Sequence, residues 1–264
     1  MIDFHNHVLP NVDDGPKTIE ESIDMLRHAS SQGITEIVQT VHFQHPKMEG
    51  KNIDYEYLLM KTKEIQDKIN EENLNIKLHL SAEVFYLPNL VEISVNKLVT
   101  VGNKKYMLIE FSNNIFPDKY EEEFYKLQKT GITPIIAHPE RYRFIQNDLN
   151  ILDMWKDRGF IIQIDAGSIL GHFGVRTKKN AIEMINKGCV HIIGSDAHKN
   201  KKRNFCLKEA YDFLENNYSA DLVNILKNNV IAIISGHSKN KISDLEQIKK
   251  NANLKDKIFK LCGL

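Results

Sequence analysis

Histidines and carboxylates that could bind metal ions recur along this chain. Near the start, apolar Ile2 and Phe4 alternate with Asp3, His5 and His7, a period of two that is typical of a β-strand with one apolar face. On an extended backbone His5 and His7 point to the same side, so both imidazoles could bind one ion. A single His-x-His pair often occurs by chance, so the case for a metal site depends on the rest of the chain.

The elements that must position these residues are strands and helices in alternation. Apolar, largely β-branched segments predict strands at 2–7, 34–41, 75–80, 105–109, 132–137, 160–164, 189–193 and 230–234. Amphipathic segments predict helices at about 18–33, 54–71, 119–130, 150–158, 177–187, 205–215 and 221–228, with a short helix and a Lys-rich tail after them. This alternation implies parallel strands with right-handed crossovers. With seven or eight such units and no Gly-x-Gly-x-x-Gly turn, we expect an α/β protein with a closed (β/α) barrel, in one domain spanning residues 1–264.

In such a barrel the chemistry lies at the C-terminal ends of the strands. Six predicted strand ends and their loops carry nine potential ligands: His5, His7, Asp14, His42, Glu83, Glu110, His138, Asp196 and His198. Buried imidazoles and carboxylates are costly unless they are paired or bind a metal, so this distribution predicts a metal site. Nitrogen and oxygen ligands without thiolate suit Mn²⁺, Fe²⁺ or Zn²⁺. Because carboxylates can bridge ions, so many ligands predict two or three ions.

Two arginines could bind a phosphoryl group near these ligands. Arg141 follows His138 by three residues, and a guanidinium can bind two phosphate oxygens at once. Arg203, in the basic segment after His198, is the second candidate. The alternative for Arg141 is a surface ion pair with Glu140, and the alternative for Arg203 is a solvated loop.

The composition excludes several other classes of protein. The 264 residues carry 35 basic and 35 acidic side chains, so the basic excess of a general nucleic-acid binder is absent. No apolar run approaches the length of a membrane span, and a strand predicted from Ile2 leaves no room for a signal peptide. Three cysteines without close pairing suggest reduced thiols, so we expect a cytoplasmic protein. The residues six positions after Cys189 and Cys206 are Ser195 and Asp212, which excludes the Cys-x₅-Arg motif of cysteine-dependent phosphatases.

Several motifs carry a resemblance to a known superfamily. The His-x-His pair, His42, Ala82-Glu83, His138 and Ser195-Asp-Ala-His198 together resemble the PHP (polymerase and histidinol phosphatase) superfamily. Longer motifs resemble the bacterial capsule and exopolysaccharide tyrosine-protein phosphatases of the CpsB/CapC/YwqE type; they lie at residues 3–16, 136–141, 166–168, 171–174 and 194–198. The resemblance spans residues 1 to about 210. One departure is Asn204, where the family pattern would place a proline after Arg203.

The resemblance implies a distorted (β/α)₇ TIM-like barrel, the PHP fold, with three metal ions that are usually Mn²⁺. One ion would bind His5, His7, Glu83 and Asp196; a second would share Glu83 and add Glu110 and His138; a third would bind Asp14, His42 and His198. It also implies a protein-tyrosine phosphatase that acts on the tyrosine-rich tail of a bacterial tyrosine autokinase and so regulates capsular or exopolysaccharide synthesis.

Three alternative functions remain open from the sequence. The first is a phosphatase of the same superfamily that hydrolyses histidinol phosphate or another small phosphomonoester. The second is a PHP-type nuclease, which the zero net charge disfavours. The third is a metal-bound scaffold that binds the kinase without catalysis, which the intact ligand set disfavours.

Overall fold

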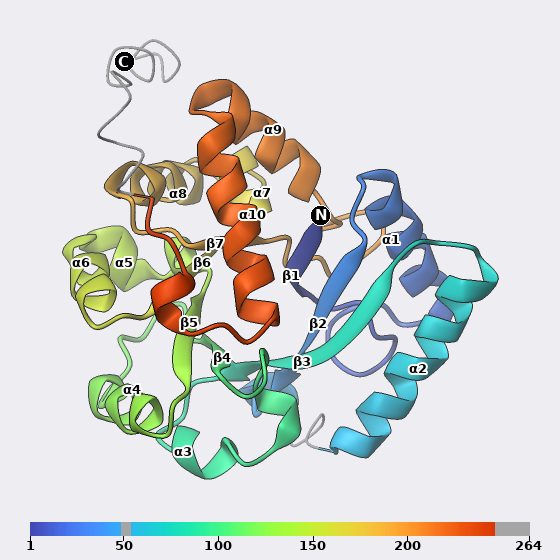
Figure 1. The fold of residues 1–264 in the computed structure, drawn as a ribbon, viewed down its shortest axis with the longest axis horizontal. Coiled ribbons are helices and arrows are strands. Elements are labelled where there is room, and N and C mark those ends of the chain that lie inside the picture. The colour runs from blue at the N-terminus through green and yellow to red at the C-terminus, as the bar shows by residue number, and fades with distance from the viewer. Residues whose placement is uncertain (49–53, 246–264) are drawn as a thin grey trace.

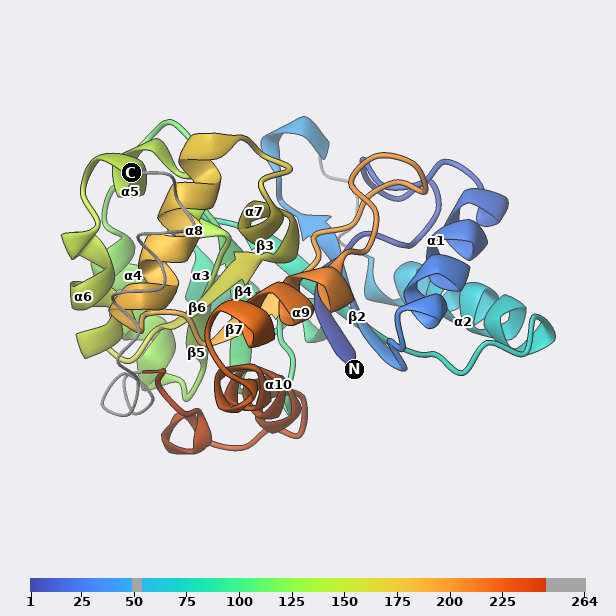
Figure 2. The same cartoon turned by 90° about the horizontal axis from the view of Figure 1, so that it is seen from above.

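Seven parallel strands form one sheet in sequential order in this computed structural model, which describes residues 1–48 and 54–245. The strands are β1 (Ile2–Asn6), β2 (Glu36–Phe43), β3 (Lys77–Phe85), β4 (Tyr106–Glu110), β5 (Thr133–Ala137), β6 (Ile161–Asp165) and β7 (Ile192–Gly194). The sheet curls into a nearly closed barrel with helices outside it, as Figures 1 and 2 show. The expected (β/α)₇ barrel in a single domain is therefore confirmed.

The barrel closes between β1 and β7 without a regular ladder. Asn6 forms an isolated bridge with Ala197, and the backbone N–H of Asp196 donates to the backbone oxygen of His5 at 2.7 Å. A Cβ atom at Gly194 would lie 2.6 Å from the Cβ atom of His5, so glycine is required for this close approach. We call this junction the seam.

Helices cover the outside of the sheet. The longer ones are α1 (Ile19–Ser31), α2 (Tyr55–Glu71), α4 (Tyr120–Lys129), α6 (Asn150–Asp157), α8 (Val175–Lys187), α9 (Leu207–Asn217) and α10 (Ala220–Ile234). Short helices are α3 (Leu90–Ile93), α5 (Arg143–Asn147) and α7 (Ala166–Leu170), with 3₁₀ turns at Pro46–Met48, Lys97–Val99, Pro139–Arg141 and Lys239–Lys241. The Thr18 hydroxyl caps α1 by accepting the N–H of Glu21 at 3.2 Å. None of the helices in the described residues is both long and apolar enough to cross a membrane.

One apolar cluster fills the barrel below its functional end. Its members from the sheet come from every strand except β3 and include Phe4, Val38, Leu108, Ile135, Ile161 and Ile192. Val230 and Ile233 of α10 belong to the same cluster, and α10 contacts β1 and β7. Figure 2 shows α10 across the end of the barrel at which β1 begins. This end is therefore closed by apolar side chains, and polar side chains face the other end.

The predicted strand at 230–234 is wrong, because these residues form the last part of α10. A short β-branched run bounded by polar residues does not distinguish a strand from a buried helix. Here Ile233 is buried and Ile231 is 49% exposed, as the spacing of a helix requires. Of the predicted C-terminal segment, the structure describes a 3₁₀ turn, and the rest of the Lys-rich tail lies outside the described residues.

Candidate metal centre

The ends of the strands bring all nine predicted ligands to one place. Each strand except β6 supplies at least one of them, either from its last residues or from the loop that follows. The structure places them in four overlapping groups whose potential ligand atoms lie within 4.8 Å of one another. The groups are His7, Asp14, His42 and His198; His5, His7 and Asp196; His5, Glu83 and His138; and His42, Glu83 and Glu110.

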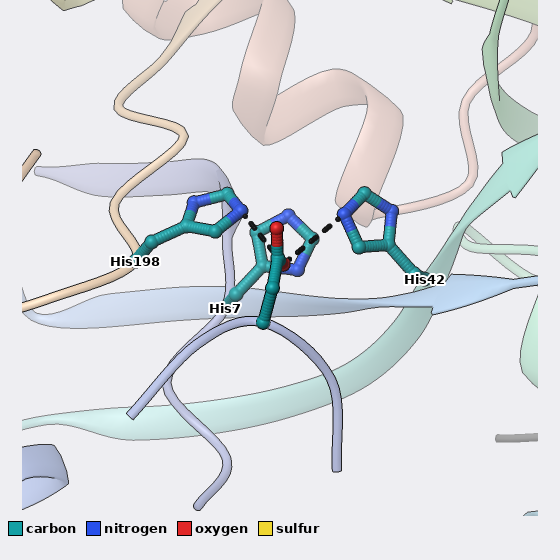
Figure 3. Close-up of side chains that lie close together, drawn as sticks. His7, His42 and His198 are labelled. Atoms are coloured by element: carbon teal, nitrogen blue, oxygen red, sulfur yellow. Dashed lines mark ion pairs between the residues drawn. The ribbon is translucent and has the colours of Figure 1, made fainter. Parts of the chain in front are cut away.

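The group around Asp14 is the most exposed part of the cluster. The carboxylate oxygen Oδ1 of Asp14 lies 3.3 Å from Nε2 of His42 and 3.1 Å from Nε2 of His198. Figure 3 shows the imidazoles of His7, His42 and His198 turned toward one another around this carboxylate. The three residues expected to hold the third ion are therefore neighbours, and His7 lies beside them.

Glu83 lies at the centre of the cluster. Its Oε2 atom is 3.2 Å from Nε2 of His5, 3.4 Å from Nε2 of His7 and 3.1 Å from Nδ1 of His42. Its Oε1 atom is 2.8 Å from Nε2 of His138. A carboxylate that faces imidazoles on both oxygens is placed to bridge two ions.

The donor set fits divalent metal ions. Within the described residues, His5 Nε2, His7 Nε2 and Asp196 Oδ1 are buried and make no hydrogen bond of acceptable geometry, although Asp196 Oδ1 lies 3.5 Å from the first nitrogen and 3.4 Å from the second. Buried polar atoms without hydrogen bonds are rare because their desolvation is not compensated. Unshared nitrogen and oxygen donors that converge in this way are what a metal ion needs.

A hydrogen bond at Nδ1 fixes the orientation of the His7 and His198 imidazoles. The Nδ1 atom of His7 lies 2.9 Å from Oδ2 of Asp13, and Nδ1 of His198 lies 2.9 Å from the backbone oxygen of Asp196. A carboxylate or carbonyl can only accept, so Nδ1 of each ring carries the proton and Nε2 keeps its lone pair for a metal. Nε2 is also the atom that each ring directs into the cluster.

Gln163 fixes the orientation of the His5 imidazole in the same way, and the sequence did not lead us to predict this role. Its Nε2 atom donates to the backbone oxygen of Ile164 at 2.8 Å and to Oδ1 of Asp165 at 3.2 Å. Its Oε1 atom is therefore the acceptor, and it lies 3.1 Å from Nδ1 of His5. The signal was present, because Gln163 is the one polar residue in the predicted strand at 160–164. Asp13, beside the predicted ligand Asp14, was likewise given no role.

The electrostatics of the cluster favour cations. Burial lowers the pKa of His5, but the charges of Glu83 and Asp196 outweigh burial and raise it to about 9. The pKa of His42 is lowered by burial and by His7, yet Glu83 and Asp14 raise it to about 10. Burial would raise the pKa of Glu83, but the facing imidazoles hold it well below its usual range. The carboxylates thus stabilise positive charge where the imidazoles converge.

Both predicted arginines lie beside the cluster and donate hydrogen bonds to the carboxylate of Asp196. Nη1 of Arg141 donates to Oδ2 of Asp165 at 2.7 Å and to Oδ2 of Asp196 at 2.6 Å. Nη2 of Arg203 donates to the same oxygen of Asp196. Arg141 is 16% exposed and Arg203 is 31% exposed, so neither is a solvated surface residue. The alternative pairing of Arg141 with Glu140 is not formed, because the Glu140 carboxylate instead accepts the backbone N–H of Asp165 at 3.0 Å.

Two histidines outside the predicted ligand set, His45 and His172, differ from its members in their surroundings. The ring of His45 lies 4.8 Å from that of His42, and its Nε2 is 3.7 Å from Oε2 of Glu110. Burial and the neighbouring His42 lower the pKa of His45 to about 4, so this ring is neutral. His172 is exposed, in the turn after α7.

Comparison with known proteins supports the same picture. Residues 1–235 match the family model described as "Capsular polysaccharide synthesis, CpsB/CapC". The chain is 36% identical over 235 residues to CapC of Staphylococcus aureus, with 88% of this chain and 91% of that protein aligned. It is 35% identical over 234 residues to tyrosine-protein phosphatase YwqE of Bacillus subtilis, with 87% of this chain and 89% of that protein aligned.

A solved structure shares the fold closely. It comes from work on YwqE from Bacillus subtilis and CpsB from Streptococcus pneumoniae, described as metal-dependent tyrosine phosphatases. It superposes with a TM-score of 0.86 at 30% identity, and the match covers 92% of this chain and 97% of that one. A family match over residues 1–235, together with relatives of this identity and coverage, shows that the chain belongs to the CpsB/CapC family of capsular polysaccharide synthesis.

Proposed function

We propose that this protein is a metal-dependent protein-tyrosine phosphatase that regulates capsular or exopolysaccharide synthesis. The observation that carries the proposal is the convergence of nine imidazole and carboxylate side chains beside two partly buried arginines. The phosphotyrosine substrate class is supported by the relatives named tyrosine-protein phosphatase.

The chain's own residues would perform three tasks in this reaction. The imidazoles and carboxylates of the cluster would hold the ions, which when bound supply Lewis acidity and a hydroxide nucleophile at neutral pH. Arg141 and Arg203 would bind the phosphoryl oxygens and stabilise the charge that develops on them. Burial lowers the pKa of Arg141, but Asp165 and Asp196 raise it far more, so its charge is permanent. Because tyrosine has a pKa of ~10, its phenolate leaves without a dedicated general acid.

We propose Mn²⁺ as the metal, with three ions shared among His5, His7, Asp14, His42, Glu83, Glu110, His138, Asp196 and His198. The absence of thiolate ligands among these residues is consistent with such a hard cation. Cysteine chemistry is not an alternative within the described residues, because Cys189 and Cys206 are buried and burial raises the pKa of the Cys206 thiol to about 12. A protonated thiol is a poor nucleophile.

The proposed protein substrate is the phosphorylated tyrosine-rich tail of a bacterial tyrosine autokinase, and the proposed location is the cytoplasm. Membership of a capsular polysaccharide synthesis family supports this partner. The three cysteines of the chain are not closely paired in sequence, which is consistent with a reducing compartment.

The test is hydrolysis of a phosphotyrosyl peptide by protein treated with EDTA and then supplied with Mn²⁺. Activity should disappear with EDTA and return with Mn²⁺, and His138→Ala should abolish it. His79→Ala is the matched control, because His79 lies near the start of β3 and pairs with Glu36 at 2.8 Å, away from the cluster. Activity that is indifferent to EDTA, or retained in His138→Ala, would contradict the proposal.

A further inference from the structure

A short turn between α7 and α8 holds one aromatic ring in a fixed position. Gly171 and Gly174 both have φ of 92°, and the N–H of Gly174 donates to the oxygen of Gly171 at 3.1 Å. The turn is tied to α7 because the N–H of His172 donates to the oxygen of Gly167 at 2.8 Å. A Cβ atom at Gly167 would lie 3.0 Å from Cε2 of Phe173, so the ring lies directly against this glycine. The ring of Phe173 therefore packs against the backbone at Gly167 and remains partly exposed.

Two guanidinium groups lie over this ring. The Cζ atom of Arg141 is 5.0 Å from the centroid of the Phe173 ring, and the Cζ atom of Arg203 is 5.7 Å from it. Both distances are within the range in which the negative face of an aromatic ring attracts a cation. The two arginines reach the ring from different segments, namely the 3₁₀ turn after β5 and the loop after β7.

This arrangement offsets the repulsion between the two guanidinium groups. Arg141 and Arg203 both donate to one oxygen of Asp196, so two positive groups are held side by side and repel each other. Asp165 balances one of these charges through Arg141. The face of Phe173 stabilises both cations at once, and it adds no negative charge that would compete with a phosphate.

The site also has unused capacity for an anion. Nε of Arg203 is buried and has no hydrogen-bond partner within the described residues. An unsatisfied buried donor on a guanidinium is suited to a phosphoryl oxygen, which can accept several such bonds. The ring that aligns the guanidinium therefore also aligns this donor.

We infer that Phe173 is a positioning residue that holds Arg141 and Arg203 for the phosphoryl group and that its exposed part favours esters with an aromatic leaving group. The ring of a phosphotyrosine begins one bond from the ester oxygen, so it must lie close to the guanidinium groups that bind the phosphate. The Phe173 ring contacts both guanidinium groups, and aromatic rings attract each other at centroid separations of about 4.5–7 Å. This inference rests on the proposed phosphatase function and adds the basis of its preference for aryl esters.

The test compares Phe173→Leu, Phe173→Tyr and wild type, all loaded with Mn²⁺. Leucine keeps most of the apolar volume and removes the aromatic face, whereas tyrosine keeps the face. Phe213→Leu is the matched control, because Phe213 is also partly buried beneath a cation, Lys178 at 5.3 Å, but lies on α9. Two quantities are measured: the affinity for inorganic phosphate by calorimetry, and the ratio of kcat/KM for phosphotyrosyl and phosphoseryl peptides.

Phe173→Leu should weaken phosphate binding and lower the phosphotyrosine to phosphoserine ratio, each by about tenfold, with unchanged metal content. Phe173→Tyr and Phe213→Leu should keep both quantities near the wild-type values. Phosphate binding that is equal in wild type and Phe173→Leu, or a loss of metal in Phe173→Leu, overturns the positioning role. An unchanged ratio overturns the preference for aryl esters. Failure of wild type to hydrolyse either peptide refutes the proposed function instead, and the phosphate titration still decides the role of Phe173.

Discussion

Loading the metal-free protein with Mn²⁺ should release at least about two protons at pH 7.5. An imidazole must be unprotonated at the nitrogen that binds a metal. In the metal-free protein the carboxylates of the cluster raise the pKa of His5 to about 9 and that of His42 to about 10, against the opposing effect of burial. His5 and His42 are therefore charged before the metal arrives. The pKa of His7 is also raised well above its usual value, chiefly by Asp13, although burial opposes this, so His7 acts in the same direction.

The size of the effect follows from these values. A group with the pKa given for His5, about 9, is about 97% protonated at pH 7.5, whereas an unperturbed imidazole at 6.5 is about 9% protonated. Three unperturbed rings would release only about 0.3 protons together. The rise in the pKa of His5 from 6.5 to about 9 also stabilises the metal-free folded state by about 3 kcal/mol. Because the folded-state pKa is raised, this stabilisation is complete below pH 6.5 and is lost as the pH rises through about 9.

Calorimetry in buffers of different ionisation enthalpy measures the number of protons released. The same titration above pH 10 is an internal control, because the rings are then largely unprotonated and the release should fall. Thermal unfolding provides the second measurement: the Tm of the metal-free protein should fall from pH 6.5 to 10, and the Tm of the loaded protein should fall less. Release of fewer than one proton at pH 7.5, or a metal-free Tm that does not fall, would refute this account of the electrostatics.

The remaining predictions concern single side chains. Arg141→Ala should lower kcat/KM for a phosphotyrosyl peptide by about 10²- to 10³-fold at unchanged metal content, and kinetics within threefold of wild type would remove Arg141 from the site. Gln163→Leu should weaken metal affinity by about 10- to 100-fold in a chelator competition, because His5 loses the acceptor at its Nδ1. The control is Gln128→Leu, which removes a surface hydrogen bond to the backbone oxygen of Arg158. Equal metal affinities for the two variants would contradict the role of Gln163. Ile233→Ala should lower the free energy of unfolding in urea by about 2–5 kcal/mol, and Ile231→Ala, which changes a half-exposed side chain of the same helix, by less than about 1 kcal/mol; similar costs for the two would argue against the helix at this segment.

The ligands could be located from the sequence because strand ends are easy to recognise. A β-branched run that stops at a histidine or a carboxylate places that side chain at one end of a parallel barrel, whatever the strand order. Glu110 and His138 were found in this way, although they are distant from the His-x-His pair in the chain. Which ion each ligand serves is set by distances between side chains, and strand periodicity does not contain that information.

The supporting residues were harder to predict for a physical reason. The role of Gln163 depends on its amide oxygen facing Nδ1 of His5, and the role of Phe173 depends on its ring lying under a guanidinium group. Hydrophobic periodicity gives no information about either contact. The last residues of α10, 230–234, were mistaken for a strand because they are all apolar, whereas the preceding part of α10 was predicted as a helix. A helix that closes the base of a barrel buries more of its surface than the outer helices, so the amphipathic signal is weak there.

The seam between β1 and β7 determines when during folding the cluster comes into existence. His5 lies at the beginning of the chain and Asp196 is 191 residues later, yet the two are joined there by a backbone hydrogen bond of 2.7 Å. A nascent chain that has not yet been synthesised beyond β7 carries several of the ligands but cannot complete the group of His5, His7 and Asp196. This group therefore forms only once the seam has closed, and an ion held by it would join the first and last strands of the sheet.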